Sequence, residues 1–171
     1  IGLIGELLFF QEFLLDRFPP VFAVDCWKGP DKSAKDFVIH SLGIESKAVG
    51  PSRTTVHISS AHQLDLDQFD ELFLSVIKIG PADETSADGF NLDGLIESIS
   101  SQISDDESVA MSMFEGKLAE AGYLPDHDYS GSSDKELRSA TNGKSIPTRE
   151  GRGWFGMFFP ERPVLVESCY Y

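Results

Sequence analysis

The amino-acid sequence predicts a mixed α/β (α+β) fold, in which an N-terminal helix precedes a four- to five-stranded mixed sheet flanked by helices. Three observations predict it: an apolar stripe at helical spacing at the start, several short strand-like runs between residues 21 and 79, and two further helical patterns after residue 90. With 171 residues and a hydrophobic fraction of 41%, the chain is long enough to bury one ordinary core.

The first predicted element is a helix over about residues 3–16, because apolar side chains recur there at intervals of three and four. Pro19 and Pro20 are expected to end it, since proline disfavours the helical conformation of the residue before it. Glu6 lies within the apolar stripe and should be partly buried, so it needs a partner, and a metal ion is one candidate. Such a helix rarely opens a domain abruptly, so we expect a segment before residue 1.

The region that follows predicts five strands, at residues 21–28, 35–40, 43–49, 53–59 and 71–79. The last of these runs is almost continuously apolar, which is typical of a strand buried on both faces. Ser60 followed by Gln63 resembles a capping box, and it predicts a short helix reaching to about residue 69.

The rest of the chain predicts an acidic loop at 81–90 and two helices. Asn91 can cap the first helix, and the second runs from about residue 106 to 121 and ends at Gly122. Beyond residue 123 the chain is polar and rich in Gly and Ser before it turns apolar again. We therefore expect a core at 1–123 and a flexible polar segment with an apolar C-terminal tail at 124–171.

Chemistry is concentrated between residues 36 and 47. Glu45 and Lys47 share one face of a predicted strand, because alternate side chains of a strand point the same way. If the runs at 35–40 and 43–49 pair as a hairpin, Asp36 can reach that face. Two carboxylates and an ammonium group suit a hard divalent cation and a phosphodiester. The simpler alternative is an edge hairpin with a cross-strand ion pair.

The net negative charge of the chain argues against binding to a polyanion such as nucleic acid. The net charge is −14 and the pI about 4.5, a balance that repels phosphate. The charge is uneven: residues 25–53 carry five basic and four acidic side chains, whereas residues 65–107 carry twelve acidic side chains and one lysine. Nucleic-acid binding would therefore need help from a partner subunit or a missing flanking domain.

Other classes of protein lack support in the sequence. There is no phosphate-binding loop, dinucleotide fingerprint or hydrolase elbow. The two cysteines are far apart and have no zinc-site spacing, which favours a reducing, cytoplasmic setting. No apolar run is long enough to cross a bilayer, so no membrane association is expected, and the start lacks the features of a secretory signal.

The arrangement resembles the PD-(D/E)XK nuclease superfamily, whose restriction-endonuclease-like core is a helix, a small mixed sheet and flanking helices. Within it, the chain is similar to the bacterial "PD-(D/E)XK motif proteins" that accompany defence and restriction systems. The matching stretches lie within about residues 2–123; they are GLIGELLF, AVDCWKGPDKSAKDF, IESKA, VHISSAHQLD and MFEGKLAEAGY. One departure is that Lys35, rather than proline, precedes Asp36.

The resemblance implies a site and an activity. Asp36 would be the metal-binding aspartate, Glu45-Ser46-Lys47 the (D/E)-X-K element, and Glu6 the acidic residue of the first helix. The expected ligands of Mg²⁺ or Mn²⁺ are Asp36, Glu45, the Ser46 carbonyl and Glu6, with Lys47 positioning water. The side chains that could contact DNA are Gln63, Ser59, Lys28 and Lys32.

The expected function is a metal-dependent DNA endonuclease of a prokaryotic restriction or phage-defence system. Its partners would be DNA and other defence-system subunits, and a homodimer is possible. The alternatives are a catalytically inactive nuclease-fold module of a defence complex, and an acidic surface that mimics DNA. A second string of the same form, Glu115-Gly116-Lys117, falls in a helical pattern and is interpreted as ordinary solvated surface.

Overall fold

The structure is a computed structural model that describes residues 2–66, 68–81, 89–103, 107–125, 137–140 and 165–168. The helical elements are α1 (Gly2–Phe9), a π-helical segment (Phe10–Leu15), α2 (Pro20–Cys26), a 3₁₀ turn (Ala61–Leu64), α3 (Leu92–Gln102) and α4 (Ser108–Glu120). The strands are β1 (Phe37–Ile39), β2 (Leu42–Val49), β3 (Thr55–Ile58), β4 (Glu71–Pro81), β5 (Leu137–Ala140) and β6 (Leu165–Ser168).

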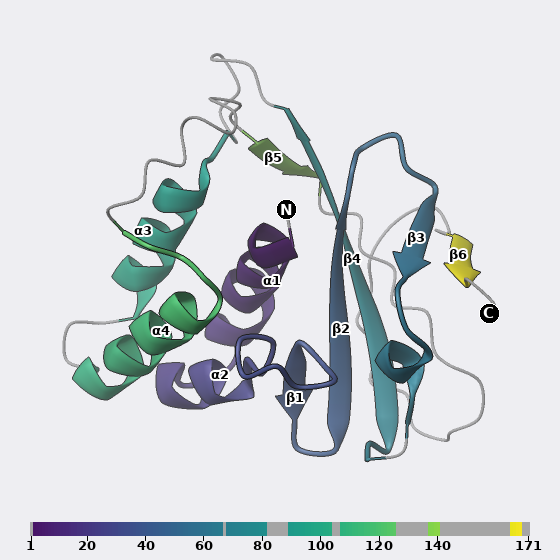
Figure 1. Cartoon of the computed structure of the whole chain (residues 1–171). Coiled ribbons are helices and arrows are strands. Elements are labelled where there is room, and N and C mark those ends of the chain that lie inside the picture. The colour runs from purple at the N-terminus through teal and green to yellow at the C-terminus, as the bar shows by residue number, and fades with distance from the viewer. Residues whose placement is uncertain are drawn as a thin grey trace.

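Four of the strands form a mixed sheet in the order β1-β2-β4-β5. Its centre is the parallel pair β2 and β4, and an antiparallel strand lies on each side. The helices cover one face, whereas β3 and β6, a parallel pair, lie on the other side of the sheet (Figure 1). The predicted fold class, with its N-terminal helix and mixed sheet, is confirmed.

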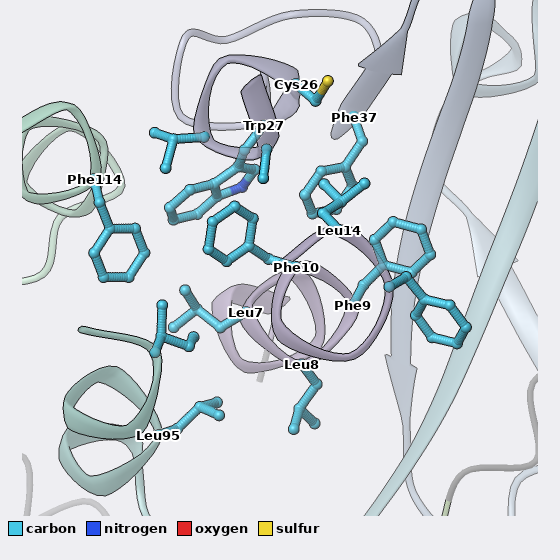
Figure 2. Close-up of a cluster of buried hydrophobic side chains, with 14 of the residues drawn as sticks. Leu7, Leu8, Phe9, Phe10, Leu14, Cys26, Trp27, Phe37, Leu95 and Phe114 are labelled. Atoms are coloured by element: carbon cyan, nitrogen blue, oxygen red, sulfur yellow. The ribbon is translucent and has the colours of Figure 1, made fainter. Parts of the chain in front are cut away.

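The main core lies between the helices and the sheet. Helix α1 is apolar on almost every side, and it is central to this core, with side chains from α2, α3, α4 and β1 around it (Figure 2). Gly5 lets the helix approach β2 closely, because a Cβ atom there would lie 2.9 Å from Cβ of Ala48. The helix is thereby held directly on the strand that carries Glu45 and Lys47.

A second, smaller core lies on the opposite face of the sheet. Val56 and Ile58 of β3 pack there against Leu74 and Val76 of β4. The prediction that the apolar run at 71–79 is buried on both faces is confirmed, because alternate residues of β4 contribute to the two cores. Because β2 pairs with β4, one face of β2 also points towards the main core and the other towards the smaller core.

The first helix extends over the predicted range but is not uniform. Its α-helical part ends at Phe9 and is followed by six residues of π-helix, to Leu15. Phe10, Phe13 and Leu14 of this segment are buried in the main core. Such segments occur in α-helices chiefly as single-turn bulges, often at functional sites.

The predicted strand at 21–28 is wrong, because residues 20–26 form helix α2. A short apolar run fits a strand or a buried helical turn equally well, and periodicity cannot separate the two. Pro20 occupies the first position of the helix, where its fixed φ favours a helical start. The buried face of α2 packs towards α4, and at its end Trp27 is close to Phe114.

The two later helices follow the predictions closely, whereas two elements nearer the candidate site are shorter than predicted. Asn91 caps α3 by accepting a hydrogen bond from the backbone N–H of Gly94 (2.7 Å), and α4 is followed by Gly122 at φ 86°. The strand predicted at 35–40 is shorter, and the helix predicted to about residue 69 is only the Ala61–Leu64 turn.

Two predictions fall mainly outside the described residues. They are the acidic loop at 81–90 and the flexible segment with its tail at 124–171, so the division of the chain at residue 123 stays a prediction. The short described parts of that region, β5 and β6, pair with β4 and β3. None of the described helices combines the length and apolar character that a membrane span requires.

Candidate active site

Asp36 lies at the edge of β2, where β1 begins. The antiparallel register pairs Phe37 with Ile44, which places Asp36 opposite Glu45. Its carboxylate does not lie over the face of the sheet: Oδ2 accepts a hydrogen bond from the backbone N–H of Ser46 (2.7 Å). The Asp36 carbonyl also accepts hydrogen bonds from the backbone N–H groups of Lys28 (2.7 Å) and Gly29 (2.9 Å), which fix the preceding turn.

Glu45 and Lys47 point to the same face of β2, as strand alternation predicts. Lys47 Nζ lies 2.7 Å from Glu45 Oε1, and the two side chains are 22% and 3% exposed. This is the face of the smaller core, since Glu45 pairs with Leu74 and Lys47 with Val76 of β4. Burial raises the pKa of the Glu45 carboxyl group, as does the nearby Asp36, whereas Lys47 lowers it.

Glu6 approaches Asp36 from the helical side of the sheet. Its Oε2 accepts a hydrogen bond from the indole N–H of Trp27 (2.8 Å). A Cβ atom on Gly29 would lie 2.5 Å from this oxygen and 3.4 Å from Oδ1 of Asp36, so both carboxylates border the same small space. Burial, and secondarily the charge of Asp36, raises the pKa of Glu6 to about 7.

Burial also raises the pKa of Asp36, although the Ser46 N–H, Lys47 and Lys35 act in the opposite direction. The charge of Asp36 disfavours ionisation of both Glu6 and Glu45, and a nearby cation would relieve this repulsion. Asp36 lies between the other two: Glu45 is on the β3 side of the sheet and Glu6 on the helical side.

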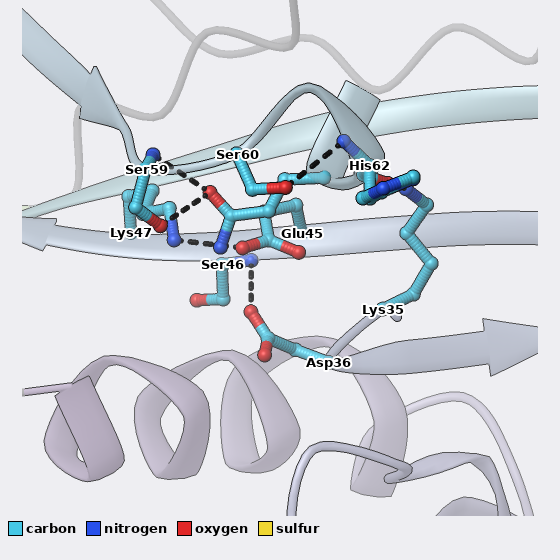
Figure 3. A network of polar contacts seen from close by, with 9 residues as sticks. Lys35, Asp36, Glu45, Ser46, Lys47, Ser59, Ser60 and His62 are labelled. Atoms are coloured by element: carbon cyan, nitrogen blue, oxygen red, sulfur yellow. Dashed lines mark hydrogen bonds and ion pairs between the residues drawn. The ribbon is translucent and has the colours of Figure 1, made fainter. Parts of the chain in front are cut away.

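The turn after β3 borders the Glu45–Lys47 face. Ser60 caps the turn, but its Oγ accepts a hydrogen bond from the backbone N–H of His62 (3.2 Å) rather than from Gln63, so the predicted Ser60–Gln63 capping box does not form. Gln63 Oε1 accepts hydrogen bonds from the backbone N–H (3.1 Å) and the hydroxyl group (3.2 Å) of Ser59. Figure 3 shows this turn beside Glu45 and Lys47.

Lys35 is a residue that the sequence analysis noted only as a departure from the family pattern. Its side chain is buried, and Nζ donates a hydrogen bond to the carbonyl of His62 (2.6 Å). Figure 3 shows it extending from beside Asp36 to the turn after β3. A buried lysine whose charge acts on Asp36 and Glu45 is a functional candidate, but its burial could not be deduced from its position next to Asp36.

Two other candidate residues lie in the turn before Asp36. Lys28 forms an ion pair with Asp25 (2.9 Å), and Lys32 is exposed at a position of positive φ (58°). The second (D/E)-X-K string lies on helix α4, as predicted. Glu115 and Gly116 are exposed, but Lys117 is not the ordinary solvated surface that was predicted: its side chain is 11% exposed and forms an ion pair with Asp31 (2.8 Å), which ties the turn to α4.

The sequence matches a family model described as "Putative PD-(D/E)XK family member" (DUF4420) over residues 1–142. The chain belongs to this family. The match covers both predicted strands of the candidate site, the helix that carries Glu6 and the turn after β3. No curated protein and no solved structure matches the chain.

Membership of the PD-(D/E)XK family indicates a nuclease-like function, and this superfamily typically uses divalent metal ions. The donor set of the candidate site fits such an ion, because the oxygens of carboxylate and backbone carbonyl groups are the ligands of hard cations. The Ser46 hydroxyl oxygen is also buried without a hydrogen-bond partner among the described residues.

The donors do not form a ready-made cage. Within the described part of the chain, no three acidic, His or Cys side chains are arranged to hold one ion. The reason is visible in the contacts above: Asp36 is turned to the Ser46 N–H, and Glu6 lies on the other side of β2 from Glu45. Rotation of the Asp36 and Glu45 side chains would be needed to bring their oxygens together.

Proposed function

We propose that this PD-(D/E)XK family member is a metal-dependent phosphodiesterase that cleaves DNA. The observation that carries the proposal is the register of β1 and β2, which sets Asp36 opposite Glu45 and leaves Lys47 beside Glu45. This brings two acidic groups and an ammonium group together where β1 begins beside β2.

The negative charge of the carboxylates in the candidate site favours a bound cation. Glu6, Asp36 and Glu45 all have raised pKa values, and the charge of Lys47 lowers all three whereas Lys35 lowers only those of Asp36 and Glu45. A divalent ion would supply the additional positive charge. Mg²⁺ or Mn²⁺ would be held by Asp36, Glu45 and the Ser46 carbonyl, with Glu6 as an outer ligand, and would stabilise the charge that develops on the phosphate.

Side chains of the protein would orient the attacking water and contact the DNA. Lys47 is fixed by its contact with Glu45, and its remaining N–H donors can orient the attacking water. Ser59, Gln63, Lys28 and Lys32 are candidate contacts with DNA, because they lie on the two turns that border the site.

The charge of the whole chain bears on how DNA would reach this site. A net charge of −14 opposes a broad DNA-binding surface. We propose that another subunit or a flanking domain contributes the basic groove, within a prokaryotic restriction or phage-defence system in the cytoplasm. A homodimer is a further way to complete the surface.

The test is a nicking assay on supercoiled plasmid with Mg²⁺ and with Mn²⁺. Asp36→Ala and Lys47→Ala should abolish nicking while circular dichroism reports an intact fold. Glu115→Ala is the control, because it removes the exposed acidic residue of the second (D/E)-X-K string, on α4. The proposal is wrong if the Asp36 and Lys47 variants cut as fast as the wild type.

A second candidate function is an inactive nuclease-fold module that binds other subunits of a defence complex. It is favoured by the contacts that Asp36 and Lys47 already make with Ser46 and Glu45, and by the acidity of the chain. Calorimetry with Mn²⁺ separates the two functions. A catalytic site should bind the ion in the wild type and in a Glu115→Gln control, and should lose it in Glu45→Gln.

A further inference from the structure

Lys35 is the most deeply buried charged residue of the candidate site, with 1% of its surface exposed. Its side chain crosses β2 at Gly43, two residues before Glu45 and on the same face of the strand. A Cβ atom on Gly43 would lie 3.2 Å from Lys35 Cγ and 3.1 Å from Phe69 Cγ. The strand therefore has a glycine at the place where the lysine side chain has to pass.

The ammonium group of Lys35 ends at the turn that follows β3. Nζ donates a hydrogen bond to the His62 carbonyl (2.6 Å), and it lies 6.0 Å from the centre of the Phe69 ring. Glu45 is near enough to oppose, electrostatically, the effect of burial on the pKa of Lys35. Lys35 thus connects the acidic cluster to the turn.

His62 is at the centre of the contacts that shape this turn. Its N–H donates to Ser60 Oγ, while its carbonyl accepts from Lys35. The adjacent Gln63 accepts two hydrogen bonds from Ser59, which closes the turn back onto the end of β3. Fixing His62 on the sheet therefore also fixes the orientation of Gln63 and Ser59.

We propose that Lys35 is a positioning residue that holds the turn of residues 59–64 on the Glu45–Lys47 face, so that Ser59 and Gln63 meet the DNA backbone in a fixed orientation. The part of this statement that concerns DNA rests on the proposed function. The part that concerns the turn rests on the contacts of Lys35 alone.

Lys35→Met tests the proposal, because methionine keeps the length and apolar stem of the side chain but removes the donor. Hydrogen exchange followed by mass spectrometry should report faster exchange in the peptide that spans residues 59–64, and unchanged exchange in β2 and α1. In the nicking assay at saturating Mg²⁺, KM for DNA should rise about three- to tenfold, the effect of one or two lost hydrogen bonds, and by a larger factor than kcat falls.

Two glycine-to-alanine variants provide a second test of the role of Lys35. Gly43→Ala should displace Lys35 and Phe69 without removing a charge, and should give the same local exchange and the same rise in KM. Gly50→Ala is the control, because the nearest atom to its new Cβ, Cγ of Arg53, is 3.9 Å away. A lower kcat with unchanged KM, or faster exchange spread over the whole fold, would assign Lys35 a structural role and overturn the proposal.

Failure of this proposal can be distinguished from failure of the proposed function. If the wild type does not cut DNA, the exchange measurement still tests whether Lys35 holds the turn of residues 59–64. Affinity for a fluorescent DNA duplex in Ca²⁺ then replaces KM. If the wild type cuts DNA but Lys35→Met leaves the exchange at residues 59–64 unchanged, the function stands and the role of Lys35 is refuted.

Discussion

Replacing Glu6 by glutamine should stabilise the metal-free protein at alkaline pH and have no effect at acidic pH. Glutamine keeps the shape of the side chain and an oxygen that can accept the Trp27 N–H, but it cannot ionise. In the folded protein the pKa of Glu6 is raised from 4.5 to about 7, first by burial and then by the charge of Asp36. The native state therefore holds a proton that the unfolded chain releases at lower pH.

The sign and size of the stability change follow from this difference between the pKa values of Glu6 in the folded and unfolded states. Stability of the wild type should fall as pH rises from about 4.5 to about 7 and then stay level, because the folded state binds the extra proton only in that window. One pKa unit corresponds to about 1.4 kcal/mol, so ionised Glu6 costs the fold about 3 kcal/mol at pH 8.5. Glu6→Gln should be more stable than the wild type by about this amount there, and equally stable at pH 4.

The assay is urea unfolding followed by circular dichroism, with EDTA present, at pH values from 4 to 8.5. Glu97→Gln, at an exposed position on α3, should match the wild type at every pH. Addition of Mn²⁺ at pH 8.5 should recover more stability in the wild type than in Glu6→Gln, because Glu6 is only an outer ligand of the ion. A stability difference between Glu6→Gln and the wild type that does not change with pH would refute the reasoning.

Three further substitutions test the packing around Glu6, the contact between α1 and β2, and the cap of α3. Gly29→Ala should displace the Glu6 carboxylate, whose Oε2 would lie 2.5 Å from the new Cβ, and the nicking assay should record a slower rate. Gly5→Ala should push α1 away from Ala48 and lower the free energy of unfolding in urea by about 1–3 kcal/mol. Asn91→Ala should remove the cap of α3 and cost about 1 kcal/mol in the same assay, without changing the nicking rate.

Local patterns predicted most of the fold, because they depend on a few neighbouring residues. The apolar stripe of α1, the cap at Asn91 and the glycine after α4 are signals of this kind. Helix α2 was missed because its seven residues are too few for periodicity to distinguish a helix from a strand. Its Pro20 could have been interpreted as the first residue of a helix.

The site was predictable only in part. Strand alternation is enough to place Glu45 and Lys47 together, since they are two residues apart. The hydrogen bond from Trp27 to Glu6 joins residues 21 positions apart, and the contact of Lys35 with His62 joins residues 27 positions apart. Such contacts depend on how helices and strands pack, which no local pattern encodes.

The π-helical segment after α1 determines the rotational phase of the first helix. Each residue of an α-helix advances the chain by about 100° around its axis, and a bulge of this kind contains one residue more than a regular turn. Winding Phe10–Leu15 as a regular α-helix, with no residue removed, would turn Glu6 by a large part of this angle relative to the buried Leu14. The acidic side chain would then face another part of the protein, although every residue of the candidate site was still present.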